Sequence, residues 1–230
     1  MTSTPLKTSD ISIIIPALNE EDNVPLLAKN LEGSDCEILL VDGGSTDATA
    51  ELARKSSFTV ITSRPGRGYQ QNAGAVQANG KILLFLHADT RLPNNFANTV
   101  VQTIANGKYL AGAFSLEIEK PTPAMRFITV CANLRSRLFQ LPYGDQAIFV
   151  ERDAFLKLKM FPELPIMEDY VFIKKAKRHG RIAVLNDAVI TSARRWQRLG
   201  VIRTTLINQL VVLGFFLKIS PERLALFYRR

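Results

Sequence analysis

A regular alternation of short apolar runs with helix-patterned stretches, between Ile11 and about Glu119, limits the fold of this chain more than any other feature. The apolar runs have the length of β-strands, and Gly, Pro, Asn, Asp or Ser residues bound them. This order of elements is typical of βαβ units, in which helices flank a mainly parallel sheet. We therefore predict an α/β fold with its first four strands at 11–15, 37–41, 58–62 and 81–86. Pro16 is expected to end the first strand, and helices are expected at 21–31 and 46–55.

Length and composition fit one domain. The chain has 230 residues, of which 47% are hydrophobic and 22% charged, so it can bury a substantial core but is too short for two full domains. Cys36 and Cys131 lie in no disulfide or metal-binding pattern, and residues 1–10 carry no secretory signal. We expect the protein to be cytoplasmic.

The net charge of +8 indicates an affinity for polyanions, which include phospholipid head groups, nucleotide diphosphates and nucleic acids. Aromatic residues are not interleaved with the basic ones, as they are in a platform on which bases stack. We therefore expect no nucleic-acid partner.

The last part of the chain differs from the rest. Its apolar residues recur at spacings of three and four, which predicts an apolar helical face: Leu199, Ile202, Leu206, Leu210, Leu213 and Leu217. The uninterrupted apolar run, 210–217, is far shorter than the ~20 residues that span a bilayer. Two alternatives remain: an amphipathic helix lying on the inner face of the plasma membrane, or a core helix that packs on the sheet.

Polar residues directly after strands are the first candidates for a site, because ligands of parallel sheets bind at the carboxyl ends of the strands. Asp42 follows an apolar strand and precedes two glycines, so it either contacts a nucleoside or begins a turn. Asp89 follows the fourth strand and could supply the oxygen ligand that Mg²⁺ or Mn²⁺ needs. His87 is either a second ligand or a hydrogen-bonded structural residue.

Further along, two segments combine charge with helix starts. Arg67 and Asn72 belong to a Gly- and Arg-containing stretch that could contact a phosphate or a sugar, or form a flexible basic loop. The pair Glu168 and Asp169 opens a helix, so it could supply a general base or only stabilise the helix N-terminus.

The polar tripeptide 144–146 reads as a turn between a loop and a strand. The segment Arg194-Arg195-Trp196 could clamp a phosphate and stack a sugar, or lie beside a membrane.

Taken in order, six segments resemble the family 2 glycosyltransferases. They are Ile13-Ile-Ile-Pro-Ala-Leu-Asn-Glu20, Val41-Asp-Gly-Gly-Ser-Thr-Asp47, Leu86-His-Ala-Asp-Thr90, Gly144-Asp-Gln146, Glu168-Asp169 and Arg194-Arg-Trp196. The resemblance covers nearly the whole chain, and small bacterial members of the family carry the same His-Ala-Asp-Thr element.

The resemblance implies a GT-A fold and an inverting transfer of a sugar from a UDP- or GDP-sugar to a hydroxyl acceptor, which a lipid could carry. It implies that Asp89 holds Mn²⁺ or Mg²⁺ and that Asp169, beside Glu168, is the general base. The remaining implied or candidate residues belong to two sets. The donor set is Pro16, Ala17, Asn19, Glu20, Asp42, Arg67, Asn72 and His87. The acceptor set is Gly144, Asp145, Gln146, Arg194, Arg195 and Trp196.

We predict a GT-A domain at 1–198, with a nucleotide-sugar half at about 1–110 and an acceptor half at about 111–198, followed by an amphipathic helical extension at 199–230. The usual Asp-x-Asp element reads His87-Ala-Asp89 here, which leaves the role of His87 open. Rival interpretations are a sugar nucleotidyltransferase, whose glycine-rich loop after the first strand is missing, and a catalytically silent nucleotide-sugar-binding or membrane-peripheral scaffold protein.

Overall fold

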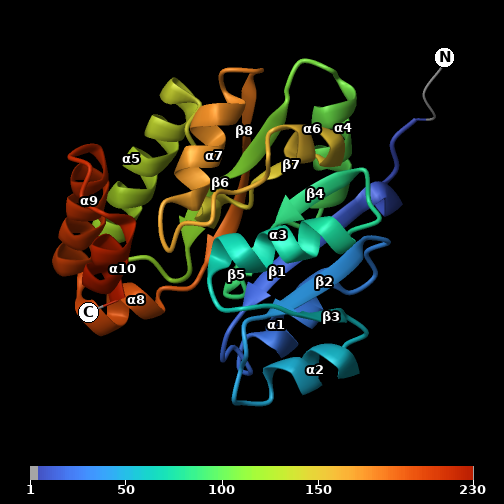
Figure 1. Ribbon diagram of the computed structural model, residues 1–230, viewed down its shortest axis with the longest axis horizontal. Coiled ribbons are helices and arrows are strands. Elements are labelled where there is room, and N and C mark those ends of the chain that lie inside the picture. The colour runs from blue at the N-terminus through green and yellow to red at the C-terminus, as the bar shows by residue number, and fades with distance from the viewer. Residues whose placement is uncertain (1–4, 230) are drawn as a thin grey trace.

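A single eight-stranded sheet runs through the computed structural model, which describes residues 5–229 (Figure 1). The strands lie in the order β3-β2-β1-β4-β7-β6-β8-β5. Their bounds are β1 Ile11–Ala17, β2 Glu37–Asp42, β3 Thr59–Thr62, β4 Ile82–Phe85, β5 Thr90–Arg91, β6 Ala111–Ile118, β7 Phe149–Glu151 and β8 Ile182–Thr191.

Helices cover both faces of the sheet. Buried side chains of α1, α2 and α4 pack in one hydrophobic cluster, and those of α3, α6 and α7 pack in a second cluster against the opposite face. The helices are α1 Val24–Leu31, α2 Thr49–Lys55, α3 Arg67–Gln77, α4 Phe96–Ala105, α5 Pro123–Phe139, α6 Arg152–Lys157, α7 Glu168–Ala176, α8 Arg194–Leu199, α9 Val201–Phe216 and α10 Pro221–Arg229. Short 3₁₀ turns span Thr8–Asp10 and Gly144–Gln146.

The predicted parallel half is confirmed. Strands β1 to β4 pair in parallel, and the side chains of β1 and β4 are buried on both faces because helices cover both. The sequence predicts that Pro16 ends the first strand. This prediction is wrong, because Pro16 lies within β1 opposite Val41. The pairing of β4 ends at the Ile14–Phe85 register, so Pro16 has no neighbour on that side that would need its missing N–H.

The second half of the sheet is mixed rather than parallel. Strand β7 runs antiparallel to both β4 and β6, whereas β8 runs parallel to β6. Because β6, β7 and β8 continue the sheet of β1 to β4, the two predicted halves share one sheet.

Two helices begin later than their sequence pattern suggests. The helix expected from Thr46 begins at Thr49, since Ser45 and Thr46 bond to other loops and the Asp47 carboxylate accepts the Thr49 N–H at 3.0 Å. The helix expected from about Glu21 begins at Val24. Both corrections lengthen the loops at the carboxyl edge of the sheet.

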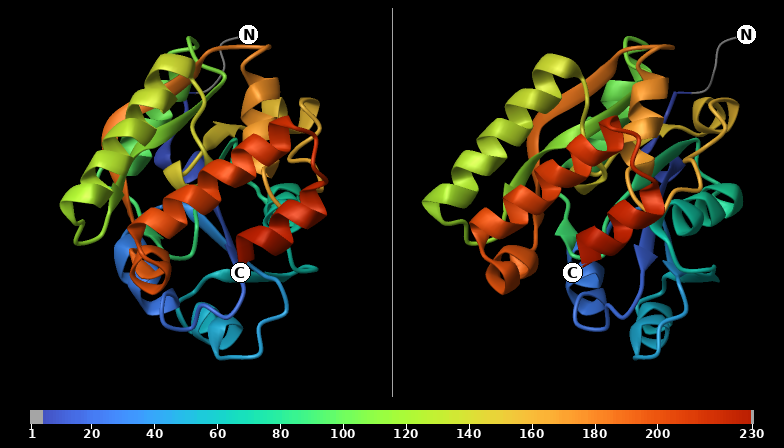
Figure 2. Two further views of the ribbon diagram at one scale, coloured as in Figure 1. Left: turned by 90° about the vertical axis from the view of Figure 1, so that its left-hand side faces the viewer. Right: turned by 60° about the vertical axis from the view of Figure 1, so that its left-hand side comes forward.

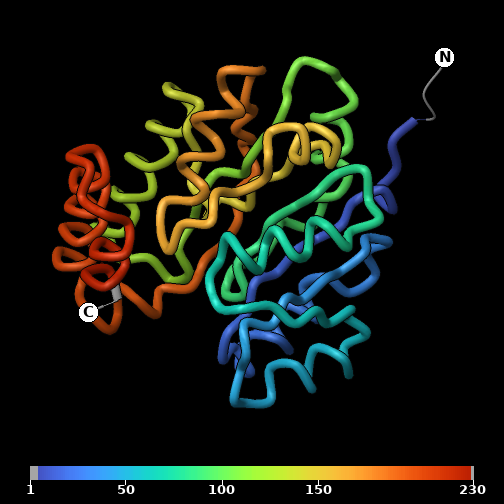
Figure 3. The backbone as a smooth tube through the Cα atoms, in the orientation of Figure 1, coloured from blue at the N-terminus to red at the C-terminus, as the bar shows by residue number. Residues whose placement is uncertain are grey.

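The C-terminal helices form a hairpin on one side of the molecule (Figures 2 and 3). One side of α9 is buried through Thr204, Ile207, Val211 and Gly214, and this side packs with Leu224 of α10 and with Met167 and Tyr170. Among residues 5–229, no helix combines the length and apolarity required to cross a bilayer.

The apolar stripe predicted from the sequence faces away from the core. Ile202 is 79% exposed, Leu206 57% and Leu210 50%, and Leu213 and Leu217 are exposed as well. The alternative in which this stripe packs on the sheet is therefore wrong, because a different side of α9 makes the core contacts.

Candidate active site

The loops after β1 and β2 are tied to each other by hydrogen bonds. Asn19, which has a positive φ of 55°, receives the Thr46 N–H on its side-chain oxygen at 2.9 Å, and its own N–H donates to Ser45 Oγ at 2.9 Å. Ser45 in turn donates through its N–H (3.1 Å) and its hydroxyl (2.5 Å) to the buried Asp42 carboxylate. These bonds fix Asp42 and Asn19 at the carboxyl edge of the sheet. The bonds from Ser45 show that Asp42 begins a turn, which is one of the two roles expected for it, and its contact with a nucleoside stays a prediction.

Gln70, on α3, binds the ends of the two strands at this edge. The sequence analysis did not identify it as a site residue. Its side-chain NH₂ donates to the carbonyl oxygens of Ala17 and Val41, at 2.8 Å each, so it links the ends of β1 and β2. A Cβ at position 43 would lie 3.0 Å from this NH₂ group, so Gly43 is needed for the approach. The only sequence signal was the Gly-Gly turn, which does not identify its partner.

A guanidinium joins two of the predicted donor residues. Arg194 Nη2 lies 3.0 Å from Glu20 Oε2 and 3.3 Å from Asp89 Oδ2. Arg194 begins α8, Glu20 lies in the loop after β1, and Asp89 lies in the turn between β4 and β5. Glu20 and Asp89 keep 21% and 28% of their side-chain surface exposed. Partial burial lowers the pKa of Arg194, but the two carboxylates raise it by more. The pKa therefore lies above its usual range.

Arg67 and Glu168 form a further ion pair. The two side chains are 3.1 Å apart, and Glu168 is only 3% exposed. Burial raises the pKa of Glu168, whereas the Arg67 charge opposes that shift. The second Glu168 oxygen, Oε2, is buried without a hydrogen-bond partner. Gly68 allows this approach of α3, since a Cβ there would lie 3.0 Å from the Pro162 carbonyl oxygen.

Asp169 is held by backbone amides at the start of α7. Its Oδ2 accepts the Gly144 N–H at 2.5 Å and its Oδ1 accepts the Tyr170 N–H at 2.7 Å. A Cβ on Gly144 would lie 3.0 Å from Asp169 Oδ2 and 3.4 Å from His87 Nε2, so only glycine leaves room where these groups meet. The predicted base and His87 therefore face the same small space.

Burial controls the protonation of two residues around this space. Burial, followed by the charge of Arg67, lowers the pKa of His87 to about 4, against the opposing charges of Asp89 and Asp169. Burial, followed by the charge of Asp169, raises the pKa of Asp145 to about 6. His87 is thus a neutral imidazole near neutral pH. Asp169 and His87 meet at Gly144, and Arg67 pairs with Glu168, the chain neighbour of Asp169.

Other predicted residues make structural contacts instead. Gln146 is fully buried, with its side chain bonded to Ser136 Oγ at 2.6 Å and to the Phe114 carbonyl at 2.9 Å. The Asn72 amide bonds to the backbone N–H and carbonyl of Phe161, at 3.1 and 2.9 Å. Both residues hold loops of the site in place.

Within the segment 194–196, only Arg194 reaches the carboxylates. Arg195 stacks 3.5 Å from the Tyr228 ring and donates to the Tyr228 carbonyl at 3.0 Å, so it anchors α10. Trp196 packs with Met125 of α5. Nothing in the sequence distinguishes the two arginines, because the direction of each depends on where α8 begins.

Comparison with known proteins agrees with this arrangement. Residues 12–160 match the sequence profile described as "Glycosyl transferase family 2". The chain belongs to glycosyl transferase family 2. The match spans the loops after β1 and β2, Asp89 and the tripeptide 144–146, and it ends before Asp169.

Curated relatives in this family share part of the chain. A 4,4'-diaponeurosporenoate glycosyltransferase of Staphylococcus haemolyticus is 34% identical over 113 residues, which are 44% of this chain and 30% of that protein. An undecaprenyl-phosphate 4-deoxy-4-formamido-L-arabinose transferase of Pseudomonas aeruginosa is 32% identical over 121 residues, 46% of this chain and 36% of that protein. The matches thus span about a third of the length of these relatives.

Solved structures show that the fold is that of the GT-A glycosyltransferases. The mannosyltransferase PcManGT from Pyrobaculum calidifontis, in complex with GDP-Man and Mn²⁺, superposes with a TM-score of 0.68 over 98% of this chain and 69% of its own, at 19% identity. S. aureus TarS 1-349 in complex with UDP-GlcNAc has a TM-score of 0.64 over 79% of this chain and 58% of its own, at 23% identity.

Proposed function

We propose that this family 2 member is an inverting glycosyltransferase that moves a sugar from a nucleotide diphosphate sugar to a hydroxyl acceptor. One observation carries the proposal. Asp169 at the start of α7 and His87 after β4 meet at Gly144, at the carboxyl edge of the sheet. Arg194 links Asp89 to Glu20, which follows Asn19 in the loop after β1. Ligands of open parallel sheets bind at this edge.

The donor side of the proposal involves the loops after β1 and β2. Asp42 and Asn19 would contact the nucleoside, with Pro16, Ala17 and Glu20 forming the floor and rim. The binding of GDP-Man by PcManGT and of UDP-GlcNAc by TarS 1-349 supports a UDP- or GDP-sugar as the donor. Arg67 and Arg194 provide guanidinium groups within this region to pair with the diphosphate.

A divalent cation fits the residues present. Asp89 offers a partly exposed carboxylate, whose protein partners are the half-exposed Arg194 at 3.3 Å and the Thr90 hydroxyl at 3.4 Å. Within residues 5–229, no cluster of three or more His, Cys, Asp or Glu could hold a metal alone, so the ion would complete its shell with donor phosphates and water, as Mg²⁺ usually does. When bound, it would neutralise the charge of the departing diphosphate.

The residues of the chain then account for one displacement. The Asp169 carboxylate takes the proton of the acceptor hydroxyl, and the hydroxyl oxygen attacks the anomeric carbon as the bond from that carbon to the diphosphate breaks. Because attack comes from the face opposite the leaving group, the configuration inverts. The two backbone N–H bonds to Asp169 orient its carboxylate for this role.

A lipid-linked acceptor is part of the proposal. The name of the Pseudomonas relative includes undecaprenyl phosphate, which is a membrane lipid. In this chain, the exposed apolar stripe of α9 supports an acceptor at a membrane surface.

The test is donor turnover by purified protein with Mn²⁺. Release of UDP or GDP from one of a panel of sugar nucleotides, without an acceptor, is expected at a slow rate. A catalytically silent binding protein would bind a donor without releasing the nucleotide. A nucleotidyltransferase would instead release a sugar phosphate when supplied with pyrophosphate, and neither result is compatible with the proposed transfer.

A further inference from the structure

Exposed apolar side chains are concentrated on one part of the molecule. Among the described residues, every large exposed apolar side chain except Leu18, Leu26 and Val76 lies on α5 or between positions 202 and 227. Single exposed apolar residues are ordinary on a protein surface, but contiguous patches of them mark contact sites.

Two helical stripes make up this patch. On α5 the exposed residues follow spacings of three and four: Phe127, Val130, Leu134 and Leu138. On α9 and the residue that follows it, the spacings are the same: Ile202, Leu206, Leu210, Leu213 and Leu217. We call these nine residues the α5–α9 face. Both helices lie toward the viewer in the left panel of Figure 2, so they lie on the same side of the molecule.

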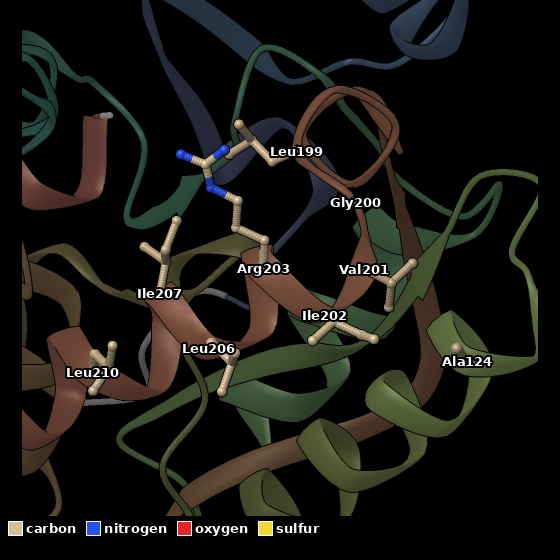
Figure 4. Close-up of a pocket in the computed structure, with 9 residues that line it drawn as sticks. All are labelled: Ala124, Leu199, Gly200, Val201, Ile202, Arg203, Leu206, Ile207 and Leu210. Atoms are coloured by element: carbon tan, nitrogen blue, oxygen red, sulfur yellow. The ribbon is translucent and has the colours of Figure 1, made fainter.

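A groove opens along α9, and the start of α5 borders it at one end. Its volume is about 640 Å³, and it is lined by Ala124 at the start of α5 and by apolar residues of α9 that include Ile202, Leu206 and Leu210 (Figure 4). Arg203 also lines it. The groove is large enough for a hydrocarbon chain and carries little that could bond a polar ligand.

The charge of the two segments has one sign only. Residues 120–144, which include α5, contain four basic residues and no acidic one: Lys120, Arg126, Arg135 and Arg137. Residues 188–221, which include α8 and α9, contain five basic residues and no acidic one: Arg194, Arg195, Arg198, Arg203 and Lys218. Arg126, Arg198, Arg203 and Lys218 are exposed.

This charge distribution decides between two occupants of the face. In a symmetric dimer the same patch meets itself, so the basic residues of two copies would face each other and repel. A bilayer that contains anionic lipids instead offers hydrocarbon for the apolar stripes and negative head groups for the arginines and lysines.

We propose that the α5–α9 face docks on an anionic lipid bilayer, with acyl chains of that bilayer occupying the groove. This inference goes beyond the transfer reaction and does not rest on it. Docking would also position the candidate site, because α8 connects the site to the groove. This helix begins at Arg194, which pairs with Asp89, and ends at Leu199, which lines the groove. Six helical residues extend about 9 Å, so docking holds the candidate site within about that distance of the lipid surface.

The experiment is co-sedimentation of the full chain with two kinds of vesicle. Vesicles of phosphatidylcholine and phosphatidylglycerol in equal parts should retain the protein at low salt, whereas pure phosphatidylcholine vesicles should retain far less. The double variant Leu134→Asp, Leu206→Asp should bind the anionic vesicles at least about tenfold more weakly, because two charges enter the apolar region. Arg203→Gln should weaken binding roughly fivefold.

The matched control is the double variant Leu26→Asp, Val76→Asp. These residues are 52% and 57% exposed, close to 54% for Leu134 and 57% for Leu206, but they lie on α1 and α3. The control should bind like the unmodified chain, and thermal unfolding midpoints check that every variant folds. Equal loss in both double variants, equal binding to both vesicle types, or a dimer that Leu206→Asp dissociates would overturn the proposal. Donor turnover is a separate measurement, so this failure is distinguishable from failure of the proposed transfer.

Discussion

Asp169 occupies a position in which two backbone N–H groups orient its carboxylate beside His87. Its removal should therefore affect the chemical step more than donor binding. We predict that Asp169→Asn lowers the rate of sugar transfer by about a hundred- to ten-thousandfold, the usual contribution of a general base. The amide keeps the shape of the side chain, so the thermal shift produced by a donor should be retained.

A control for this substitution exists on α6. Asp153 also lies in the first turn of a helix but is exposed outside the site, so Asp153→Asn should leave transfer unchanged. An Asp169→Asn enzyme as active as this control would contradict the assignment of the base.

Asp145 leads to a prediction about pH. Its carboxyl is neutral in the folded protein up to pH about 6, compared with an ordinary pKa of 3.8, so the stability contributed by the protonated form is complete below pH 3.8 and is lost as the pH rises past about 6. Asn has no charge to lose. Asp145→Asn should therefore raise the free energy of unfolding by up to about 3 kcal/mol at pH 7 and by almost nothing near pH 4.

Urea denaturation of both proteins at the two pH values measures this difference. A stabilisation of the same size at pH 4 and pH 7 would show that the substitution acts through packing rather than through the buried charge.

The predictability of the site from the sequence differs from residue to residue. Asp42 and Asp89 could be identified because they follow apolar strands, and Asp169 because of the resemblance of its segment to the family. Gln70 could not, since its role depends on two carbonyl groups, of Ala17 and Val41, that only the folded sheet brings together. Helical phase likewise decides that Arg194, and not Arg195, meets Asp89.

At the scale of elements, β1 to β4 follow from the alternation of apolar runs, whereas β8 was missed. Its pairing with β6 shifts register between Ala113 and Ser115, which face Val184 and Ala188. The intervening residues 185–187 bulge out and place Asn186 and Asp187 at exposed positions within the strand. Polar residues inside a bulge interrupt the period of two on which strand prediction depends.

Helix α3 packs so closely on β1 that a glycine in its middle is required. A Cβ at Gly74 would lie 2.5 Å from Ile14 Cγ2 and 3.0 Å from Val41 Cγ2, both on buried strands. Gly74→Ala should thus destabilise the protein by about 1–3 kcal/mol, although alanine favours a helix. Chemical denaturation measures this change.

Gly214→Ala is the comparison in α9. Its Cβ would meet Leu224 Cδ2 at 2.7 Å, at the end of a flexible side chain that can move, so the loss should be well below that of Gly74→Ala. The opposite ranking would indicate that α3 can shift away from the sheet.

On the scale of the whole molecule, the candidate site combines residues from both predicted halves of the chain, and a donor bound there would hold these halves together. A ligand that binds only the folded protein stabilises it by about 2.7 kcal/mol at 100 times its dissociation constant. We predict that one UDP- or GDP-sugar raises the unfolding temperature in the presence of Mn²⁺ and raises it less when EDTA removes the ion.

Two variants test where the donor and the ion bind. Asp89→Ala should abolish the dependence on Mn²⁺, because it would remove a metal ligand. Asp42→Ala should abolish the shift itself, because it would remove a nucleoside contact. Asp153→Asn serves again as the control that retains both effects. A shift that survives in both alanine variants would mean that the donor binds elsewhere than at the carboxyl edge of β1, β2 and β4.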